Sequence, residues 1–497
     1  MKKRIAGFSL GTIILIAIVM ISATMHFKHF QKDLMGMHVW RQTETQSTIQ
    51  NFYEEDMNIF NPRRNDRGNG EGFHRMEFPL MQWLVAGTYK IFGNHLIISR
   101  IFMFIIGLFS VFGMYKLLKT IFGHEFPAIA GAWAFNFSPS FYYFTINPMP
   151  DNLALCFGIW GIALFFLWLK KGSLWSLFLS GLFLGLASLC KLPFILYFSV
   201  PVMYFIMEAW KSITIQSSTI QSSIFKAAGI LIFTLPPLAW YISVVPQWHG
   251  NGIVQGILDV KVPASVLLDN FRHHLTITLT ESLLNYGAVL LFLASFFFIV
   301  KKKAFKNPLF PVFAVWGLVI VLYFLFELNM IGKSHDYYLF PFLPLLFILV
   351  SYGAFNLFKV KSRLVKYFVL LLLFILPLLA YLRMDGRWNP EKPGFNRDLL
   401  VYKNELRDAV PKDALCIAGN DISHFIFFYY IDKKGWGFDN NKLDEEQVGK
   451  MIKGGATYLY SDSRQIEDKA KIAGFLNELI LEKGSVRVFR LKQGFQP

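Results

Sequence analysis

Cysteine and charge are both scarce in this 497-residue chain. There are three cysteines, Cys156, Cys190 and Cys416, without a Cys-x-x-Cys spacing, so neither a disulfide framework nor a structural zinc site is expected. Charged residues make up 16% of the chain, where a soluble domain has about 25%. Hydrophobic residues make up 54%. This composition predicts an α-helical membrane protein that crosses the bilayer many times.

Several motifs of soluble enzymes are also absent from the sequence. There is no P-loop, which argues against direct ATP hydrolysis, and there is no HExxH or GxSxG motif. The net charge of +16 does not indicate nucleic-acid binding, because the basic residues lie mostly in short loops between apolar segments. No nucleic-acid partner is therefore expected.

Long apolar runs are abundant instead. With a window of about 19 residues, the sequence contains about eleven candidate spans: 6–25, 96–118, 127–145, 151–169, 173–190, 193–210, 224–245, 278–300, 309–327, 337–357 and 365–383. The first run resembles a signal peptide. Its length and the lack of a clear cleavage pattern favour an uncleaved first helix with its basic end in the cytoplasm.

The loops between these spans alternate in charge. The loops that contain Lys170 and Lys171, Lys301 to Lys303, and Lys359 to Lys366 fall on one side, and the short turns on the other side carry almost no cations. Cytoplasmic loops are enriched in lysine and arginine. The pattern therefore predicts a cytoplasmic N-terminus and, with an odd number of spans, a C-terminus outside the cytoplasm.

Two long segments are predicted outside the cytoplasm. The first is a loop of about 26–95, in which helical spacing predicts a helix over 43–57 lying in the membrane interface and a second helix from Pro79 to Gly93. The second is residues 384–497, where 414–419, 456–462 and 485–491 read as strands and 397–409 and 464–482 as helices. We therefore expect a transmembrane domain over 1–383 and a small extracytoplasmic α/β domain over 384–497.

The segment from His38 to Phe52 is the richest in chemistry. If a helix begins near Thr43, its first amides point toward His38 and Arg41 and form a phosphate site, with Glu44 beside it as a base for an acceptor hydroxyl. In the other interpretation, Thr43 caps the helix, Glu44 complements its dipole, and Arg41 pairs with Glu44 or a lipid phosphate.

Further charged residues follow in the same loop. Arg63 and Arg64 are candidates for binding a donor phosphate, although interfacial arginines ordinarily hold lipid headgroups. Asp66 and Glu77 are reserve candidates for the base.

Three residues at the outer ends of predicted spans complete the set. Asp151 opens a span and is either a helix-start residue or a site carboxylate. Lys191 either reaches to headgroups or neutralises a phosphate, and His335 is placed to hydrogen-bond a phosphate or sugar. Arg100 reads as a headgroup anchor. Polar groups near hydrocarbon are costly, so the common depth of Glu44, Asp151, Lys191 and His335 predicts one outward-facing pocket.

These segments together resemble a known family. WRQTETQSTIQNF (40–52), EFPLMQWLVAGTYKIFG (77–93) with Arg100, PDNLAL (150–155), CKLP (190–193) and HDYYLFPFLP (335–344) are similar to motifs of the C-type membrane glycosyltransferases. The likeness is to the bacterial branch near protein mannosyltransferases and aminoarabinose transferases.

The resemblance implies a fold and an activity. Such enzymes move a sugar, usually with inversion, from a polyprenyl-phosphate donor to a glycan, lipid or protein acceptor outside the cytoplasm, and a bacterial plasma membrane would be the location. Glu44 maps nearest to the family's catalytic acidic position. Relatives usually carry Asp there, often in an Asp-Glu pair, whereas this chain has Thr-Glu-Thr. The base therefore remains open among Glu44, Asp66, Glu77 and Asp151.

Two rival functions fit the same residues less well. A transporter or flippase of a glycolipid or related anion would need polar residues at mid-bilayer, and the predicted spans contain few. A non-catalytic scaffold would use the C-terminal domain to bind a partner. A divalent metal ion would suit the outer acidic residues, but no Asp-x-Asp spacing requires one.

Overall fold

The computed structural model describes residues 4–5, 8–68, 70–214, 220–248, 255–259, 261–439 and 442–493. The described residues form two compact units. The helical unit comprises Met1–Phe30, Met76–Phe78 and Arg100–Asp385, and the mixed unit comprises Gln31–Arg75, Pro79–Ser99 and Gly386–Pro497. The mixed unit thus unites the first long loop with the C-terminal segment, which are far apart in the sequence.

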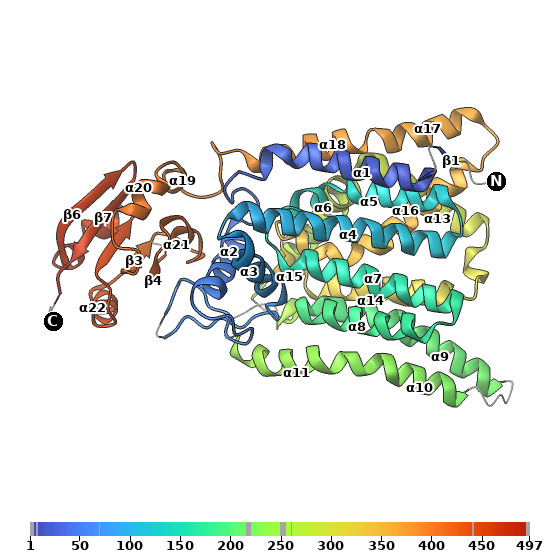
Figure 1. Cartoon of the computed structure of the whole chain (residues 1–497), viewed down its shortest axis with the longest axis horizontal. Coiled ribbons are helices and arrows are strands. Elements are labelled where there is room, and N and C mark those ends of the chain that lie inside the picture. Colours follow the sequence, from blue (N-terminus) through green and yellow to red (C-terminus); the bar gives the residue numbers. More distant parts are fainter. Residues whose placement is uncertain are drawn as a thin grey trace. The chain divides into compact units, whose positions relative to one another are not determined.

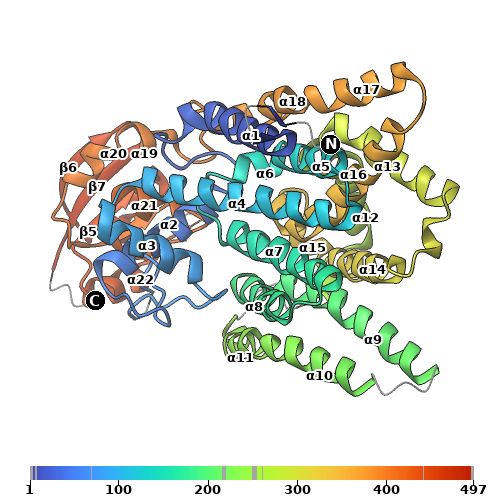
Figure 2. The same cartoon turned by 45° about the vertical axis from the view of Figure 1, so that its right-hand side comes forward.

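Helices dominate the helical unit, and several lie side by side (Figures 1 and 2). Its longer α-helices are α1 (Leu10–His26), α4 (Leu96–Phe122), α5 (Glu125–Asn136), α7 (Pro150–Lys171), α8 (Leu174–Cys190), α9 (Ser199–Thr214), α10 (Ile220–Leu231), α11 (Leu235–Val244), α12 (Ala264–His273), α13 (Tyr286–Lys301), α14 (Phe310–Phe326), α16 (Leu343–Phe358), α17 (Arg363–Phe374) and α18 (Leu376–Met384). Short elements include α6 (Pro139–Phe144), α15 (Leu328–Ile331), the 3-10 helices η2 (Leu192–Phe198) and η8 (Asp336–Phe342), and the π-helix η6 (His274–Leu283).

Each of the eleven predicted apolar segments contains helix. Among the described residues, seven helical stretches are long and apolar enough to cross a membrane: Gly11–His29, Leu96–Phe122, Pro150–Lys171, Leu192–Ser212, Gln221–Gln247, Asp336–Phe358 and Arg363–Trp388. An eighth is formed if Ala264–Leu283 and Tyr286–Lys301, which meet at a bend of 114°, count as one. The membrane character is confirmed, and the number of eleven spans stays a prediction.

One predicted span, 127–145, is not continuous. It is divided between α5 and α6 at Ser138, whose backbone is extended (φ −61°, ψ 123°). Pro139 follows directly, and a proline disfavours the helical conformation in the residue before it. The expectation of a single straight span here was wrong for this local reason.

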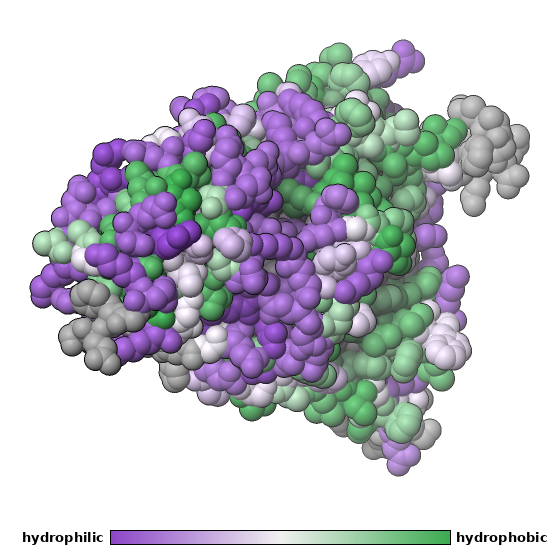
Figure 3. Space-filling view, turned by 60° about the vertical axis from the view of Figure 1, so that its left-hand side comes forward, coloured by the Kyte–Doolittle hydropathy of each residue, from purple (hydrophilic) through white to green (hydrophobic). Residues whose placement is uncertain are grey.

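Small residues let neighbouring helices of this unit approach closely. The Ser180 hydroxyl on α8 donates to the Gly161 carbonyl on α7 at 2.7 Å. A Cβ atom on Gly353 of α16 would collide with the carbonyl of Leu291 on α13. Glycine and serine have this role at membrane helix interfaces. Large apolar side chains cover the outside of the helices, and this surface is mostly hydrophobic in Figure 3.

The mixed unit is built on a five-stranded sheet of order β4-β3-β5-β7-β6. Its strands are β3 (Leu415–Gly419), β4 (Lys434–Gly437), β5 (Tyr458–Ser461), β6 (Leu476–Lys483) and β7 (Val486–Leu491). β3 pairs in parallel with β4 and β5, while β7 pairs antiparallel with β5 and β6. The helices of this unit are α2 (Val39–Glu54), α3 (Leu80–Phe92), α19 (Arg397–Val401), α20 (Lys403–Asp408), α21 (Ile426–Ile431), α22 (Glu445–Lys453), α23 (Arg464–Glu467) and α24 (Ala470–Ala473).

The three predicted C-terminal strands are confirmed as β3, β5 and β7, but the helix expected over 464–482 is wrong. Only α23 and α24 are helical there, and β6 occupies Leu476–Lys483 with a partner in β7. Pairing with a neighbouring strand decided the conformation of this polar, half-exposed stretch, as tertiary context often does.

The first-loop helices also differ from expectation in their surroundings. Ile49 and Phe52 of α2 are buried in the mixed unit, so they pack on protein and not on a lipid interface. α3 ends before Gly93 as predicted (φ 88°), and its buried residues include Met81, Val85 and Tyr89. The first loop is therefore part of a folded core.

Candidate functional site

Helix α2 begins earlier than its sequence suggests. His38 adopts a left-handed conformation (φ 56°) and caps the helix, which starts at Val39. Arg41 thus lies in the first turn and Glu44 in the second, and the anion site expected at the amides near Thr43 does not form. Arg41 pairs with Glu44, as in the alternative interpretation. The other parts of that interpretation were wrong, because His38 and not Thr43 is the N-cap and Glu44 lies outside the first turn.

Glu44 is a buried carboxylate with two charged or polar neighbours. It is 4% exposed. A terminal nitrogen of Arg41 lies 2.5 Å from Oε2, and Nε2 of His74 lies 2.9 Å from Oε1. Burial raises the pKa of Glu44, but the Arg41 guanidinium and the His74 hydrogen bond outweigh it and lower the pKa to about 2. The carboxylate is therefore ionised at neutral pH.

Arg63 and Arg64, predicted as phosphate ligands, have carboxylate partners within the mixed unit. Arg63 pairs with Glu55 and Glu71, each at 2.9 Å. Arg64 donates to the Asp66 carbonyl at 3.1 Å and lies 3.9 Å from its carboxylate. Neither arginine forms an ion pair with Glu44.

Asp66 fixes the first loop to the C-terminal sheet. Its carboxylate lies 3.1 Å from Nδ1 of His424, and its backbone forms a parallel bridge with Gly435 of β4. Burial raises the pKa of Asp66, while His424 and Arg64 lower it to below its ordinary value. Asp66 thus joins the first loop to the C-terminal segment at His424, the residue before Phe425.

The turn before α21 supports the Glu44 cluster from the C-terminal segment. The two carboxylate oxygens of Asp421 accept bonds from the backbone amides of Ser423 (2.9 Å) and Phe427 (2.9 Å), which fixes the turn. The ring of Phe425 in this turn lies 6.2 Å from the ring of His74. The imidazole that contacts Glu44 is therefore packed against the C-terminal segment.

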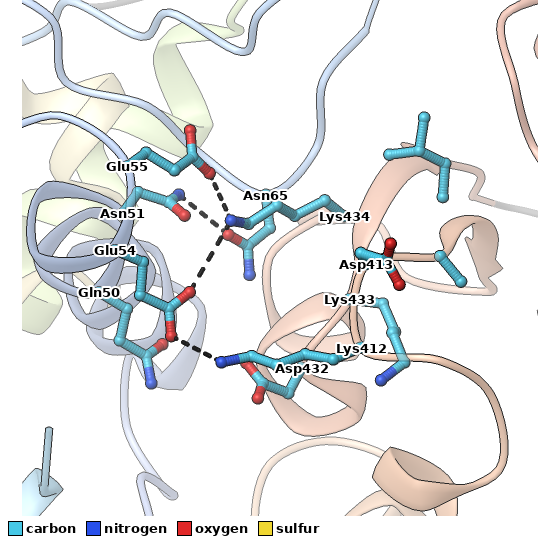
Figure 4. A pocket seen from close by; sticks show the side chains of 12 residues that line it. Gln50, Asn51, Glu54, Glu55, Asn65, Lys412, Asp413, Asp432, Lys433 and Lys434 are labelled. Carbon is cyan, nitrogen blue, oxygen red and sulfur yellow. Dashed lines mark hydrogen bonds and ion pairs between the residues drawn. The ribbon is translucent and has the colours of Figure 1, made fainter.

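A polar cavity of about 460 Å³ opens at the C-terminal end of α2 (Figure 4). Ion pairs cross it from Glu54 to Lys412 (3.2 Å) and from Glu55 to Lys434. Its remaining lining residues are Gln50, Asn51, Asn65, Asp413, Ala414, Leu415, Asp432 and Lys433. None of the predicted site residues lines this cavity, which instead marks the junction of α2 with the starts of β3 and β4.

The helical unit brings a second set of predicted residues together. Lys191 Nζ lies 3.5 Å from Asp151 at the start of α7. The same ammonium group lies over the rings of Tyr337 and Tyr338, at 5.7 and 5.2 Å from their centroids. The ring of His335 contacts both tyrosines, at 5.9 and 5.8 Å. Asp151, Lys191 and His335, which are far apart in sequence, thus form one cluster.

Glu77 lies beside this end of α8. The backbone N–H of Phe78 donates to the carbonyl of Leu189 at 3.3 Å, two residues before Lys191.

The expectation that Arg100 anchors a lipid headgroup was wrong. Arg100 is fully buried and donates to Asn147 Oδ1 at 2.8 Å. Because its guanidinium has protein partners, it is not a headgroup anchor.

The sequence did not single out His74 or His424 as site residues. A lone histidine in a loop carries no spacing signal, and its partner becomes visible only when the chain folds. Glu44 belongs to the mixed unit, whereas Asp151, Lys191 and His335 belong to the helical unit. The convergence of all four into a single pocket stays a prediction.

The side chains that could bind a metal ion do not gather in the described part of the chain. Among those residues no group of three or more His, Cys, Asp or Glu side chains is placed to hold an ion. Three of the acidic candidates have charged or polar partners: Glu44 pairs with Arg41, Asp151 with Lys191 and Asp66 with His424.

Comparison with known proteins identifies the fold. Residues 77–240 match the family model of dolichyl-phosphate-mannose-protein mannosyltransferase. The structure is similar to ArnT from Cupriavidus metallidurans in the apo state, with a TM-score of 0.68 and 12% identity over 98% of this chain and 100% of that chain. At the level of sequence, no curated protein matches the chain.

Two further solved structures have a similar fold. ArnT from Cupriavidus metallidurans bound to undecaprenyl phosphate has a TM-score of 0.63 and 12% identity over 98% of this chain and 99% of that one. The Archaeoglobus fulgidus oligosaccharyltransferase in the apo form has a TM-score of 0.59 and 12% identity over 91% and 69% of the two chains. The chain is a multi-pass membrane protein with the C-type glycosyltransferase fold that its sequence predicts.

Proposed function

We propose that this chain is a membrane glycosyltransferase that moves a hexosyl or pentosyl group from a polyprenyl-phosphate carrier to an extracytoplasmic acceptor, with inversion. The fold of the whole chain and the family match over residues 77–240 support a transferase. ArnT, which shares the fold, binds undecaprenyl phosphate. The sugar on such a carrier is already activated by its bond to phosphate. The enzyme therefore does not need to bind a nucleotide, which agrees with the absence of a P-loop from the sequence.

The observation that carries the proposal is the buried, ionised Glu44 held between Arg41 and His74. A solvent-excluded carboxylate at an imidazole is an arrangement that supports proton transfer from a hydroxyl. We assign this cluster to activation of the acceptor hydroxyl. Asp66, which contacts His424 and lies 3.9 Å from Arg64, is the reserve candidate.

We assign the donor phosphate to the cluster of Lys191, His335 and Asp151 in the helical unit. The leaving phosphate gains negative charge as the sugar departs, and fixed cations aimed at developing charge are usually the largest catalytic term. Lys191 supplies such a charge, and Asp151 orients it. His38, Arg41, Arg63 and Arg64 are the reserve phosphate ligands, and Glu77 and Asp151 remain reserve bases.

The proposed location is the plasma membrane of a bacterium, with a cytoplasmic N-terminus. The segments 1–383 and 384–497 are the proposed transmembrane and extracytoplasmic domains, and the acceptor is met on the outer side. The lysine-rich loops that alternate with nearly cation-free turns support this orientation.

The proposal is tested first by the lipids that accompany the protein. Mass spectrometry of the purified protein is expected to detect a polyprenyl phosphate or its sugar adduct, and Lys191→Met is expected to lower its amount. Lys333→Met, which removes an exposed lysine paired with Asp269, is the matched control. Equal retention by both variants would reject the phosphate assignment.

The second test follows release of polyprenyl phosphate from the sugar adduct identified in the first. Glu44→Gln keeps the size of the side chain and removes its charge, and it is expected to lower release by at least a hundredfold. Glu54→Gln, at the other end of the same helix, is expected to retain activity. Normal turnover in Glu44→Gln would remove the Glu44 cluster from the mechanism.

A further inference from the structure

Both oxygens of the Glu44 carboxylate already have partners. Oε2 faces Arg41 at 2.5 Å and Oε1 faces His74 at 2.9 Å, and the side chain is 5% exposed. Each oxygen keeps a second lone pair, but the closed surroundings of the side chain restrict the approach of a hydroxyl from solution. The carboxylate is therefore well placed to orient Arg41 and His74.

His74 has the opposite character. Its side chain is 27% exposed, so the ring reaches solvent while Nε2 bonds Glu44. Its backbone N–H donates to the Pro62 carbonyl at 2.9 Å, and its ring packs against Phe425. These contacts fix the imidazole from the loop, from α2 and from the C-terminal turn.

The contact with Glu44 also decides the tautomer. A carboxylate without a proton only accepts, so Nε2 carries the hydrogen and Nδ1 keeps its lone pair. Within the described part of the chain, no polar or charged side chain contacts Nδ1 of His74. A carboxylate that fixes the tautomer of a histidine and stabilises its charged form is the arrangement of histidine general bases in hydrolases.

We propose that His74, oriented by Glu44, is the general base that takes the proton of the acceptor hydroxyl at Nδ1. The inference rests on the proposed function and assigns the reacting proton within it. The acceptor oxygen forms its bond to the anomeric carbon as its O–H bond breaks and the proton moves to Nδ1. The bond between that carbon and the phosphate oxygen breaks, and its electron pair leaves with the phosphate.

The surrounding charges support this direction of transfer. The resulting imidazolium lies against the Glu44 carboxylate, which is itself held by Arg41 on α2. On the loop, the neighbouring Arg75 directs its guanidinium to the Phe60 carbonyl, and on the C-terminal turn His424 faces Asp66. The proton leaves to water from the exposed ring after transfer, which restores the neutral base.

Chemical rescue tests the proposal. His74→Ala is expected to lose about a hundredfold or more in rate and to regain activity with added imidazole. His95→Ala, at an exposed histidine of the same loop, is expected to keep its rate. Loss of activity that imidazole does not restore, in a His74→Ala protein whose α2 amides exchange at the wild-type rate, would reject His74 as the base. Absence of release by the wild type would instead reject the proposed function.

Discussion

Removal of Arg41 should destabilise the mixed unit through Glu44. The lowering of the Glu44 pKa from 4.5 to about 2, at 1.36 kcal/mol per unit, corresponds to about 3 kcal/mol. Because the pKa is depressed, this stabilisation is fully present above pH 4.5 and is lost as the pH falls through the folded value near 2. At pH 7, Arg41→Met leaves the buried carboxylate with His74 alone, and up to ~3 kcal/mol should be lost.

Hydrogen exchange of the α2 amides measures this change, since local opening of one unit need not unfold the whole chain. The double variant Arg41→Met with Glu44→Gln should recover much of the loss, because the unpaired charge is gone. Arg63→Met, which breaks a more exposed pair with Glu55, should cost about 0–1 kcal/mol. Equal effects of the single and double Arg41 variants would refute a buried charge pair at this position.

Three other expectations follow from single contacts. The hydrogen bond with Asp66 raises the pKa of His424, so its stabilisation is full below pH 6.5 and lost as the pH rises through the folded value. The protection factors of the amides of residues 63–68, which correct for the intrinsic rise of exchange with pH, should therefore fall toward pH 9 in the wild type, and Asp66→Asn should remove that pH dependence. Gly353→Ala would collide with the Leu291 carbonyl and should cost about 1–3 kcal/mol, seen as a lower Tm. Tyr430→Phe removes the hydroxyl that donates to the Leu34 carbonyl and should cost about 1–3 kcal/mol, measured by exchange near residue 34; an unchanged rate would contradict the contact.

Periodicity and composition predicted what depends on neighbouring residues. Pro150 and Gly172 bound α7 as their conformational preferences require, with Gly172 at φ 70°. The apolar runs became helices, and the alternating C-terminal segments became strands at the expected places. These features need only local preference and burial.

What the sequence left undetermined depends on distant partners. The start of α2 was misplaced because His38 adopts a left-handed conformation that few non-glycine residues take. β4 was missed because its short sequence KGWG gains strand structure only by pairing with β3. His74 was not assigned a role because its partner Glu44 lies thirty residues earlier, and no spacing rule connects a loop histidine to a helix carboxylate.

The union of the first loop with the C-terminal segment constrains the order of biosynthesis. Leu34 and Asp33 are bonded by Tyr430 and Lys403, residues that a ribosome adds several hundred positions later. During synthesis the buried side chains of the loop stay without these partners until the C-terminal segment has been made. A chain that stops early would therefore lack Phe425, which packs against His74 beside Glu44.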